Sequence, residues 1–305
     1  MYLHARTELR TIRDVLRFAV SRFNEAKLAF GHGTDNAFDE AAFLILHALH
    51  LPLDCLDPFL DARLTRAELG RVLDLIERRI VERTPAAYLT GETWLGELRF
   101  HVDARVIVPR SFIAQLIRSR FSPWLSDDVS IPRALDLCTG CGCLAVILAL
   151  EFPEAQVDAA DVSDGALTVA RRNVHEYGLE NRIELVQSDV FAALRGRRYD
   201  LIVANPPYVT DAAMAALPAE YRREPDVALA GGADGMDVVR RIVREAAEHL
   251  TEHGMLAVEV GHNRALAEAA FPELMLTWAE TDGGEDRVFL VARADLPRTS
   301  RSPAA

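Results

Sequence analysis

The stretch 134-ALDLCTGCGC-143 decides the fold, because a predicted strand runs directly into a glycine-rich loop. The strand is apolar apart from Asp136, whereas Gly140 and Gly142 permit a tight turn and a close approach of a ligand to the backbone. The apolar run 144-LAVILALE-151 then predicts a helix whose N-terminus presents free N–H groups. A strand, a glycine loop and a helix in this order favour a nucleoside site in an α/β domain.

Strand and helix patterns alternate from this stretch almost to the end of the chain. The predicted strands are 134–138, 156–161, 182–187, 199–204, 254–260, 274–281 and 286–293, and the predicted helices include 144–151, 164–178 and 235–250. Such alternation predicts a mostly parallel, doubly wound sheet. The last two strands are too close for a crossover, so we expect an antiparallel C-terminal hairpin. This α/β pattern resembles the seven-stranded, Rossmann-like class I methyltransferase sheet.

The N-terminal part of the chain has helical rather than alternating patterns. One apolar face, with residues at three- and four-residue spacing, is formed by Leu9, Ile12, Leu16, Ala19 and Phe23. A second helix is predicted over 39–50, and Thr65 with Glu68 forms a capping box at the start of a third. Alternating residues in 87–108 predict a β-hairpin, and Pro109 to Ser111 open a short helix.

These patterns predict four segments. We expect a helical domain over 1–85, a β-hairpin linker over 86–110, a domain with the methyltransferase-like sheet over 111–294 and a disordered tail over 295–305.

Composition limits the classes of function. The 305 residues carry a net charge of −12, which argues against broad contact with a nucleic-acid backbone and is compatible with a basic protein partner. No apolar run reaches the roughly 18 residues of a membrane span, and the N-terminus is unlike a signal peptide, so we expect a cytoplasmic protein that binds neither DNA nor a membrane. The three clustered cysteines lack a second ligand cluster, so no metal is predicted.

Acidic residues at strand ends favour one nucleoside ligand. Gly140 and Gly142 with Ala145 also fit a loose dinucleotide fingerprint, but a carboxylate at Asp136 would repel a pyrophosphate and would suit the cationic methionine end of S-adenosylmethionine. Asp161 is placed to hold ribose hydroxyls, and Asp189 to receive the adenine amino group. The alternative is that both aspartates only cap helices. The predicted cofactor contacts are Asp136, Cys138, Thr139, Gly140, Cys141, Gly142, Asp161, Asp189, Val190 and Asn205.

A rigid corner follows the fourth predicted strand, in 201-LIVANPPYVT-210. The two prolines fix φ and remove two N–H donors, so the corner offers carbonyls and one amide side chain. A planar NH2 group can donate to the Asn205 side-chain oxygen and the Pro206 carbonyl while Tyr208 packs on its face. We therefore predict Asn205, Pro206, Pro207 and Tyr208 as catalytic residues, without a strong general base. The alternative is a rigid turn without chemistry.

Several stretches together resemble the HemK-type protein-glutamine methyltransferases. They are 88-YLTGETWLGELRFHVDARVIVPR-110, 136-DLCTGCG-142 with Asp161, 187-QSDVF-191, 205-NPPY-208 and 224-EPDVALAGGADG-235. The match covers most of the chain. It implies that Gly140, Gly142, Asp161 and Asp189 bind S-adenosylmethionine and that Asn205 contacts both the cofactor and a glutamine side chain. It also implies that the helical N-terminal domain recognises a protein substrate.

The stretch 109-PRSFIAQLIRSRFSPWL-125 separates two branches of that family. It resembles the PrmB branch, which implies a glutamine of the third large-subunit ribosomal protein as the substrate. Phe112 replaces an expected proline and Cys138 a common glycine; the second change is tolerable if position 138 does not need a positive φ. The alternatives are methylation of release factors, methylation of an adenine amino group in nucleic acid, and a non-catalytic role in ribosome assembly.

Overall fold

The computed structural model describes residues 4–126 and 128–297, and the chain divides into two compact units. The first unit combines 1–104 with 217–224, and the second combines 105–216 with 225–305. The segment 217–224 therefore interrupts the second unit in sequence and belongs to the first. Within the described ranges, no helix is long and apolar enough to cross a membrane.

The first unit is built mainly of helices. They are α1 (Ala5–Glu8), α2 (Ile12–Glu25), α3 (Ala37–Ala48), α4 (Arg66–Glu82) and α5 (Ala86–Thr90), with a 3-10 turn η1 at Asp57–Phe59. The predicted capping box of Thr65 and Glu68 is confirmed at the start of α4. A second box, in which Thr11 and Asp14 cap each other's backbone, begins α2 at Ile12. Leu9 consequently lies before α2, and the prediction that it continues the helical face was wrong.

A two-stranded hairpin follows α5 in the first unit. Strands β1 (Glu92–Leu95) and β2 (Leu98–His101) pair antiparallel, as predicted. The sequence predicted that the hairpin begins at 87, which was wrong. Ala86 and Ala87 instead lie in α5, where both are buried, and Gly91, whose φ is +76°, caps the end of this helix. The hairpin lies within the first unit, whereas the sequence predicted a separate linker.

The second unit contains a seven-stranded sheet in the order β5-β4-β3-β6-β7-β9-β8. The strands are β3 (Arg133–Leu137), β4 (Gln156–Asp161), β5 (Ile183–Gln187), β6 (Tyr199–Ala204), β7 (Leu250–Glu259), β8 (Thr277–Thr281) and β9 (Gly284–Ala292). β9 pairs antiparallel with β7 and β8, and the other pairs are parallel. The predicted methyltransferase-like sheet with its antiparallel hairpin is confirmed. β7 begins at Leu250, four residues before its predicted start, because Leu250 pairs with Tyr199.

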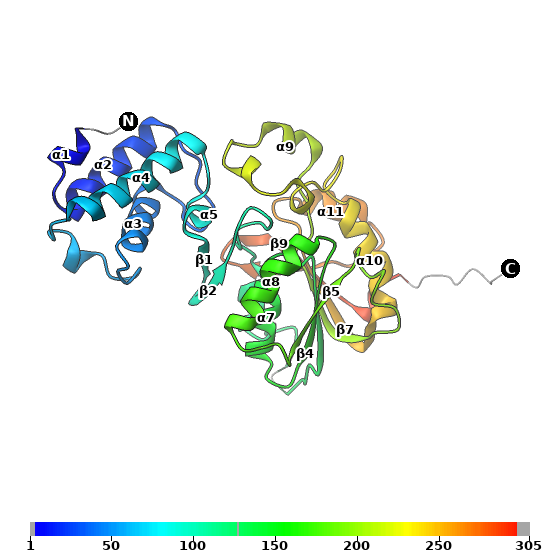
Figure 1. The fold of residues 1–305 in the computed structure, drawn as a ribbon. Helices are drawn as coiled ribbons and strands as arrows, with labels where there is room; N and C mark the ends of the chain where they lie inside the picture. Colours follow the sequence, from blue (N-terminus) through cyan, green and yellow to red (C-terminus); the bar gives the residue numbers. More distant parts are fainter. Residues whose placement is uncertain (1–3, 127, 298–305) are drawn as a thin grey trace. The chain divides into compact units, whose positions relative to one another are not determined.

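Helices cover both faces of this sheet. α7 (Cys143–Glu151) and α8 (Asp164–Glu176) lie on one face, and α10 (Asp237–His249) and α11 (Arg264–Ala270) on the other (Figure 1). The short helices α6 (Ile113–Arg118) and α9 (Asp211–Ala216) and the 3-10 turns η2 (Tyr221–Arg223), η3 (Asp226–Ala228) and η4 (Arg293–Asp295) complete the secondary structure.

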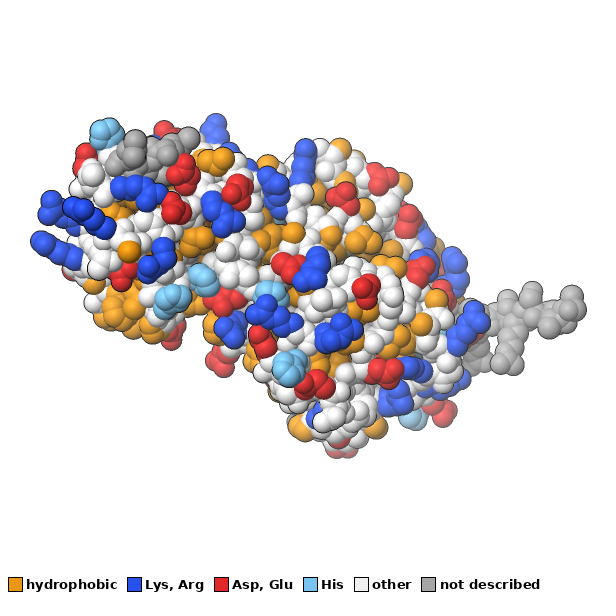
Figure 2. Space-filling model, in the orientation of Figure 1, with side chains coloured by type: hydrophobic (Ala, Val, Ile, Leu, Met, Phe, Trp, Pro, Cys, Tyr) orange, Lys and Arg blue, Asp and Glu red, His pale blue; other side chains and the backbone are white. Residues whose placement is uncertain are grey.

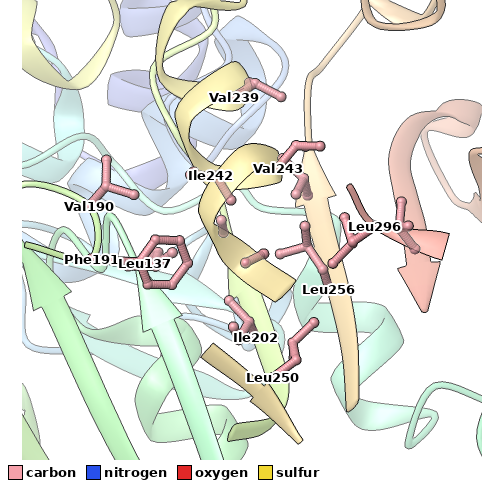
Figure 3. Packing of buried hydrophobic residues seen from close by; sticks show 14 of the residues in the cluster. Leu137, Val190, Phe191, Ile202, Val239, Ile242, Val243, Leu250, Leu256 and Leu296 are labelled. Carbon is pink, nitrogen blue, oxygen red and sulfur yellow. The ribbon is translucent and has the colours of Figure 1, made fainter. Parts of the chain in front are cut away.

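The core beneath α10 fixes this helix on the sheet. Ile242 and Val243 point toward Ile202 of β6 and Leu256 of β7, and all four side chains are buried (Figure 3). Leu296 joins the same cluster at 4% exposure, so the prediction of a disordered tail from 295 was wrong at its first residues. Residues 298–305 of the predicted tail lie outside the described residues.

Candidate active site

The sheet brings the glycine loop and the proline-rich corner to the same edge. β3 lies between β4 and β6, and Leu137 at its carboxyl end is in register with Ala160 of β4 and Ala204 of β6. In a doubly wound sheet, ligands bind outside these carboxyl ends. The loop after Leu137 and the corner after Ala204 therefore border one crevice.

A cavity of about 330 Å³ lies at this edge, which is within the usual size range of small-ligand pockets. Of the predicted site residues, it is lined by Cys138, Gly140, Asp161, Asp189, Val190, Asn205 and Pro207. Further lining residues that the sequence did not predict include Arg105, Val106, Ile107, Ser163, Ser188, Val227 and Ala228. Val227 and Val162 are 56% and 50% exposed, so the crevice offers apolar surface to a ligand.

Asp161 joins the glycine loop to the start of α8. Its Oδ2 accepts a hydrogen bond from Gly140 N at 2.9 Å, and its Oδ1 accepts one from Ser163 N at 2.9 Å. Burial raises the pKa of this carboxyl above its usual value, against the opposing effect of these backbone donors. A Cβ added to Gly140 would meet no atom within 4 Å, so the loop leaves open space beside Asp161.

Asp136 lies beneath the loop and is not among the cavity-lining residues. It is fully buried, and its Oδ2 accepts hydrogen bonds from Thr139 Oγ1 at 2.5 Å and Ala145 N at 3.0 Å. Its Oδ1 is buried without a partner among the described residues. Burial raises the pKa of Asp136 to about 7. The carboxyl thus holds the loop to the first turn of α7, and its predicted contact with a cationic ligand stays a prediction.

Two of the cavity-lining residues have strained backbone conformations. Cys138 has φ +59° and Val190 has φ +50°, a region that side chains with a Cβ rarely adopt. The sequence predicted that cysteine is tolerable at position 138 if that position does not need a positive φ. The structure has a positive φ there, so this condition is not met. Such strain costs on the order of 1 kcal/mol per residue and is concentrated at functional sites.

The other loop residues have structural contacts. Cys141 O accepts a hydrogen bond from Asn173 Nδ2 of α8 at 2.8 Å, and Thr139 N donates to Ala160 O at 3.0 Å. A Cβ at Gly142 would lie 3.1 Å from Ala170 Cβ, so this glycine permits α7 and α8 to pack closely. Burial raises the pKa of the Cys138 thiol, and a hydrogen bond with Cys141 raises the pKa of the Cys143 thiol. A raised pKa keeps a thiol protonated, so both thiols are expected to be unreactive.

The corner residues divide between the cavity and the protein interior. Asn205 and Pro207 line the cavity, whereas Pro206 is buried. No hydrogen-bond partner of the Asn205 side chain occurs in the described part of the chain, so its amide is available to a ligand. Tyr208 is half-buried and is not among the cavity-lining residues, and Asn263 Nδ2 donates to its carbonyl at 2.7 Å.

Three glycines make room for Tyr208. An added Cβ would lie 2.7 Å from Tyr208 Cα at Gly231, 2.3 Å from Tyr208 O at Gly235 and 2.6 Å from Tyr208 Cε2 at Gly261. Real Cβ atoms essentially never come this close, so each of these positions requires glycine. The sequence signal was present in 224-EPDVALAGGADG-235, but its contact with the corner is visible only in the structure.

Two further polar groups were not predicted as site residues. Arg241 of α10 forms an ion pair with Asp189 at 2.9 Å, so the carboxylate predicted to receive an adenine amino group already has one partner. Glu259 ends β7 and is 1% exposed; the Tyr208 hydroxyl donates to its Oε1 at 3.5 Å. Neither contact is encoded by spacing in the sequence, because each joins elements more than 50 residues apart.

Comparisons with known proteins agree with this geometry. The methyltransferase small domain family matches residues 124–220. The protein named ribosomal protein uL3 glutamine methyltransferase from Bordetella pertussis is 59% identical over 95% of this chain and 98% of its own. Proteins of the same name from Neisseria gonorrhoeae and Bradyrhizobium diazoefficiens are 58% and 52% identical and cover 97% and 95% of this chain and 99% and 93% of their own. The chain belongs to the ribosomal protein uL3 glutamine methyltransferase family, as the HemK-type resemblance predicted.

Proposed function

We propose that this methyltransferase transfers a methyl group from S-adenosylmethionine to the side-chain nitrogen of a glutamine in ribosomal protein uL3. The observation that carries the proposal is the meeting of Asn205 with Gly140 and Asp161 around one cavity. The names of relatives that match nearly the full length of this chain support uL3 as the substrate.

The residues of the cavity fit this cofactor. Open space beside Gly140 admits a ligand to the loop backbone, and Asp161 offers carboxylate oxygens to ribose hydroxyls. Val162 and Val227 offer apolar surface to a flat base. When bound there, S-adenosylmethionine supplies a methyl group on a sulfonium, which is a good leaving group because the product thioether is neutral.

The corner supplies acceptors for the substrate. An amide nitrogen is a poor nucleophile because its lone pair is delocalised into the carbonyl. The Asn205 side-chain oxygen and the Pro206 carbonyl orient the NH2 group and favour a more electron-rich nitrogen. Substitution of Asn205 removes one of these acceptors at the first position after β6.

The test is transfer of labelled methyl from S-adenosylmethionine to purified uL3, with a release factor and an adenine-containing nucleic acid in parallel. We expect label on a glutamine of uL3 alone, located by mass spectrometry. Asn205→Ala should lower kcat on the order of a hundredfold, as removal of other preorganised polar groups does. Asn181→Ala, at an exposed position outside the cavity, is the matched control and should retain activity.

Each other result has a distinct meaning. Label on the release factor alone would reject uL3 as the substrate but retain the chemistry at Asn205. Label on nucleic acid alone would reject the substrate class. No transfer by the wild type to any of the three would favour a non-catalytic role.

A further inference from the structure

A buried carboxyl connects two segments that the proposed function treats separately. Glu259 ends β7, and its two oxygens have different partners. Oε2 accepts hydrogen bonds from Ser111 Oγ at 2.6 Å and Phe112 N at 2.9 Å. Oε1 accepts one from the Tyr208 hydroxyl at 3.5 Å. One side chain therefore contacts both the turn that begins α6 and the corner that follows β6.

The turn at Ser111 and Phe112 lies in the stretch that distinguishes the branches of the family. Phe112 has φ −70°, which proline also adopts, but a proline at this position would have no N–H to donate to Glu259. The Phe112 ring fits over Gly283, where an added Cβ would lie 2.5 Å from ring atoms. Phenylalanine in place of the proline expected from the resemblance therefore adds a donor to Glu259.

The geometry points to Glu259 as a positioning residue for the proposed methyl transfer: it holds the Tyr208 ring at the glutamine site and links that ring to the 111–112 turn. This inference rests on the proposed function. Glu259 is 1% exposed and absent from the cavity lining, so it acts through Tyr208 and does not touch the substrate. The close approach of Gly261 to the ring leaves Tyr208 little room to reorient.

The protonation state of Glu259 decides whether its carboxyl accepts a hydrogen bond from the Tyr208 hydroxyl or donates one to it. Because Ser111 and Phe112 both donate to Oε2, a proton on the carboxyl lies on Oε1 and faces the Tyr208 hydroxyl. The ionised carboxylate accepts from that hydroxyl, whereas the protonated form donates to it. Burial raises the pKa of Glu259 to about 7, opposed by its hydrogen bonds and by Arg110. Arg287 of the neighbouring β9 places its guanidinium over the Phe112 ring.

Glu259→Gln tests this contact selectively. The amide oxygen can replace Oε2 as the acceptor for Ser111 and Phe112, which leaves an NH2 group facing Tyr208 that cannot accept its proton. We expect a kcat about tenfold lower with S-adenosylmethionine affinity within about twofold of wild type. The wild-type kcat should rise with pH through about 7, whereas the kcat of the variant should not change over that range.

A double-mutant cycle with Tyr208→Phe shows whether Glu259 acts through the tyrosine. We expect the double variant to be no slower than the slower single variant. An unchanged kcat and pH profile in Glu259→Gln, or a tenfold loss that persists undiminished in the Tyr208→Phe background, would overturn the inference.

An NMR measurement on the wild type separates this inference from the proposed function and does not depend on the folding of Glu259→Gln. Protein with 13C-labelled tyrosine rings is titrated from pH 5 to pH 9, and Tyr208→Phe assigns the Tyr208 signal. A signal that shifts with a midpoint near pH 7 supports the contact even if no substrate accepts a methyl group. A Tyr208 signal that does not shift would reject the contact even if uL3 is methylated.

Discussion

At the scale of single residues, buried acids hold the candidate site together. Asp136 lies next to the last residue of β3 and Glu259 ends β7, the two strands that flank β6, and burial raises the pKa of each to about 7. Each accepts hydrogen bonds from the start of a helix, α7 in one case and α6 in the other. Their role in the fold is therefore to attach helices to strand ends, and ionisation of either acid opposes folding.

The effect of Asp136 on stability should depend on pH. The unfolded chain releases this proton near pH 3.8 and the folded chain near pH 7, so the folded state binds more protons between these values. The contribution of Asp136 to stability is complete below about pH 4 and is lost as pH rises through about 7. Three pKa units correspond to at most about 4 kcal/mol.

Asp136→Asn removes this dependence while it retains an acceptor for Thr139 and Ala145. Urea unfolding of both proteins at pH 5 and pH 8 measures the difference. We expect the variant to gain stability relative to wild type by about 2–3 kcal/mol between the two pH values, because only about two of the three pKa units lie between pH 5 and pH 8. Glu259 titrates in both proteins, so its effect cancels. An equal difference at both pH values would contradict the raised pKa of Asp136.

At the scale of elements, the space around Tyr208 is bounded by backbone from two loops, one with Gly231 and Gly235 and one with Gly261. The strictest approach is at Gly235, where a Cβ would lie 2.3 Å from Tyr208 O and φ is +76°. Gly178 has a similar φ of +65° but no atom within 4 Å of an added Cβ. A substitution at either glycine would therefore strain the backbone, but only at Gly235 would the added side chain also collide with neighbouring atoms.

Alanine substitutions at these two positions separate the effect of backbone strain from the effect of a steric collision. Gly178→Ala should cost about 1 kcal/mol of stability through its left-handed backbone and leave methyl transfer unchanged. Gly235→Ala should cost at least about 1 kcal/mol more and lower kcat at least tenfold, because the corner must shift. Thermal unfolding and the methyl-transfer assay measure both effects. Equal stability and equal kcat in the two variants would show that the corner tolerates movement.

Elements with strong local patterns were predictable from the sequence. The strands 156–161 and 199–204 have the predicted bounds, and the Thr65–Glu68 capping box begins α4 as expected. Helices α9 and α11 were not predicted, because α9 buries no residue and α11 buries only Ala267, so neither has an apolar face to detect. Loop and corner residues that line the cavity were predictable because glycine and proline constrain the local backbone.

Contacts between distant elements were not predictable. Glu259 was part of an apolar strand pattern, and nothing in its spacing indicates that Ser111 and Tyr208 are its partners. The positive φ at Cys138 was not predicted for a related reason, since only the assembled loop determines that angle. The sequence therefore predicted residues that line the cavity, but not the buried groups that contact them.

At the scale of the whole molecule, the chain passes between its two units at 104–105, 216–217 and 224–225. The segment 217–224 therefore joins the first unit between two parts of the second. Positive and negative side chains are interspersed over the face drawn in Figure 2.

Arg79 of α4 connects the segment 217–224 to the helices of the first unit. It is fully buried, and its Nε donates to Glu40 Oε1 at 2.7 Å while its Nη2 donates to Ala29 O at 2.9 Å. Its Nη1 lies 3.6 Å from Glu220 Oε1. Arg83 Nη1 also donates to Glu220 Oε1, at 3.1 Å. Arg79 is thus the hydrogen-bonded cation of Glu40 and the second of two cations near Glu220.

Arg79→Met should lower the free energy of unfolding by about 3–5 kcal/mol, because it leaves the buried carboxylate of Glu40 without its cation and removes one of two cations near Glu220. The control is Arg13→Met, which breaks an exposed ion pair with Asp61 and should cost less than about 1 kcal/mol. Urea unfolding measures the stability of each variant, and hydrogen exchange measures protection of the amides of 217–224. We expect faster exchange in this segment only in Arg79→Met, since Glu220 lies within it. If both variants unfold at the same urea concentration as wild type and exchange in 217–224 is unchanged, the buried ion pairs do not hold the segment to the first unit.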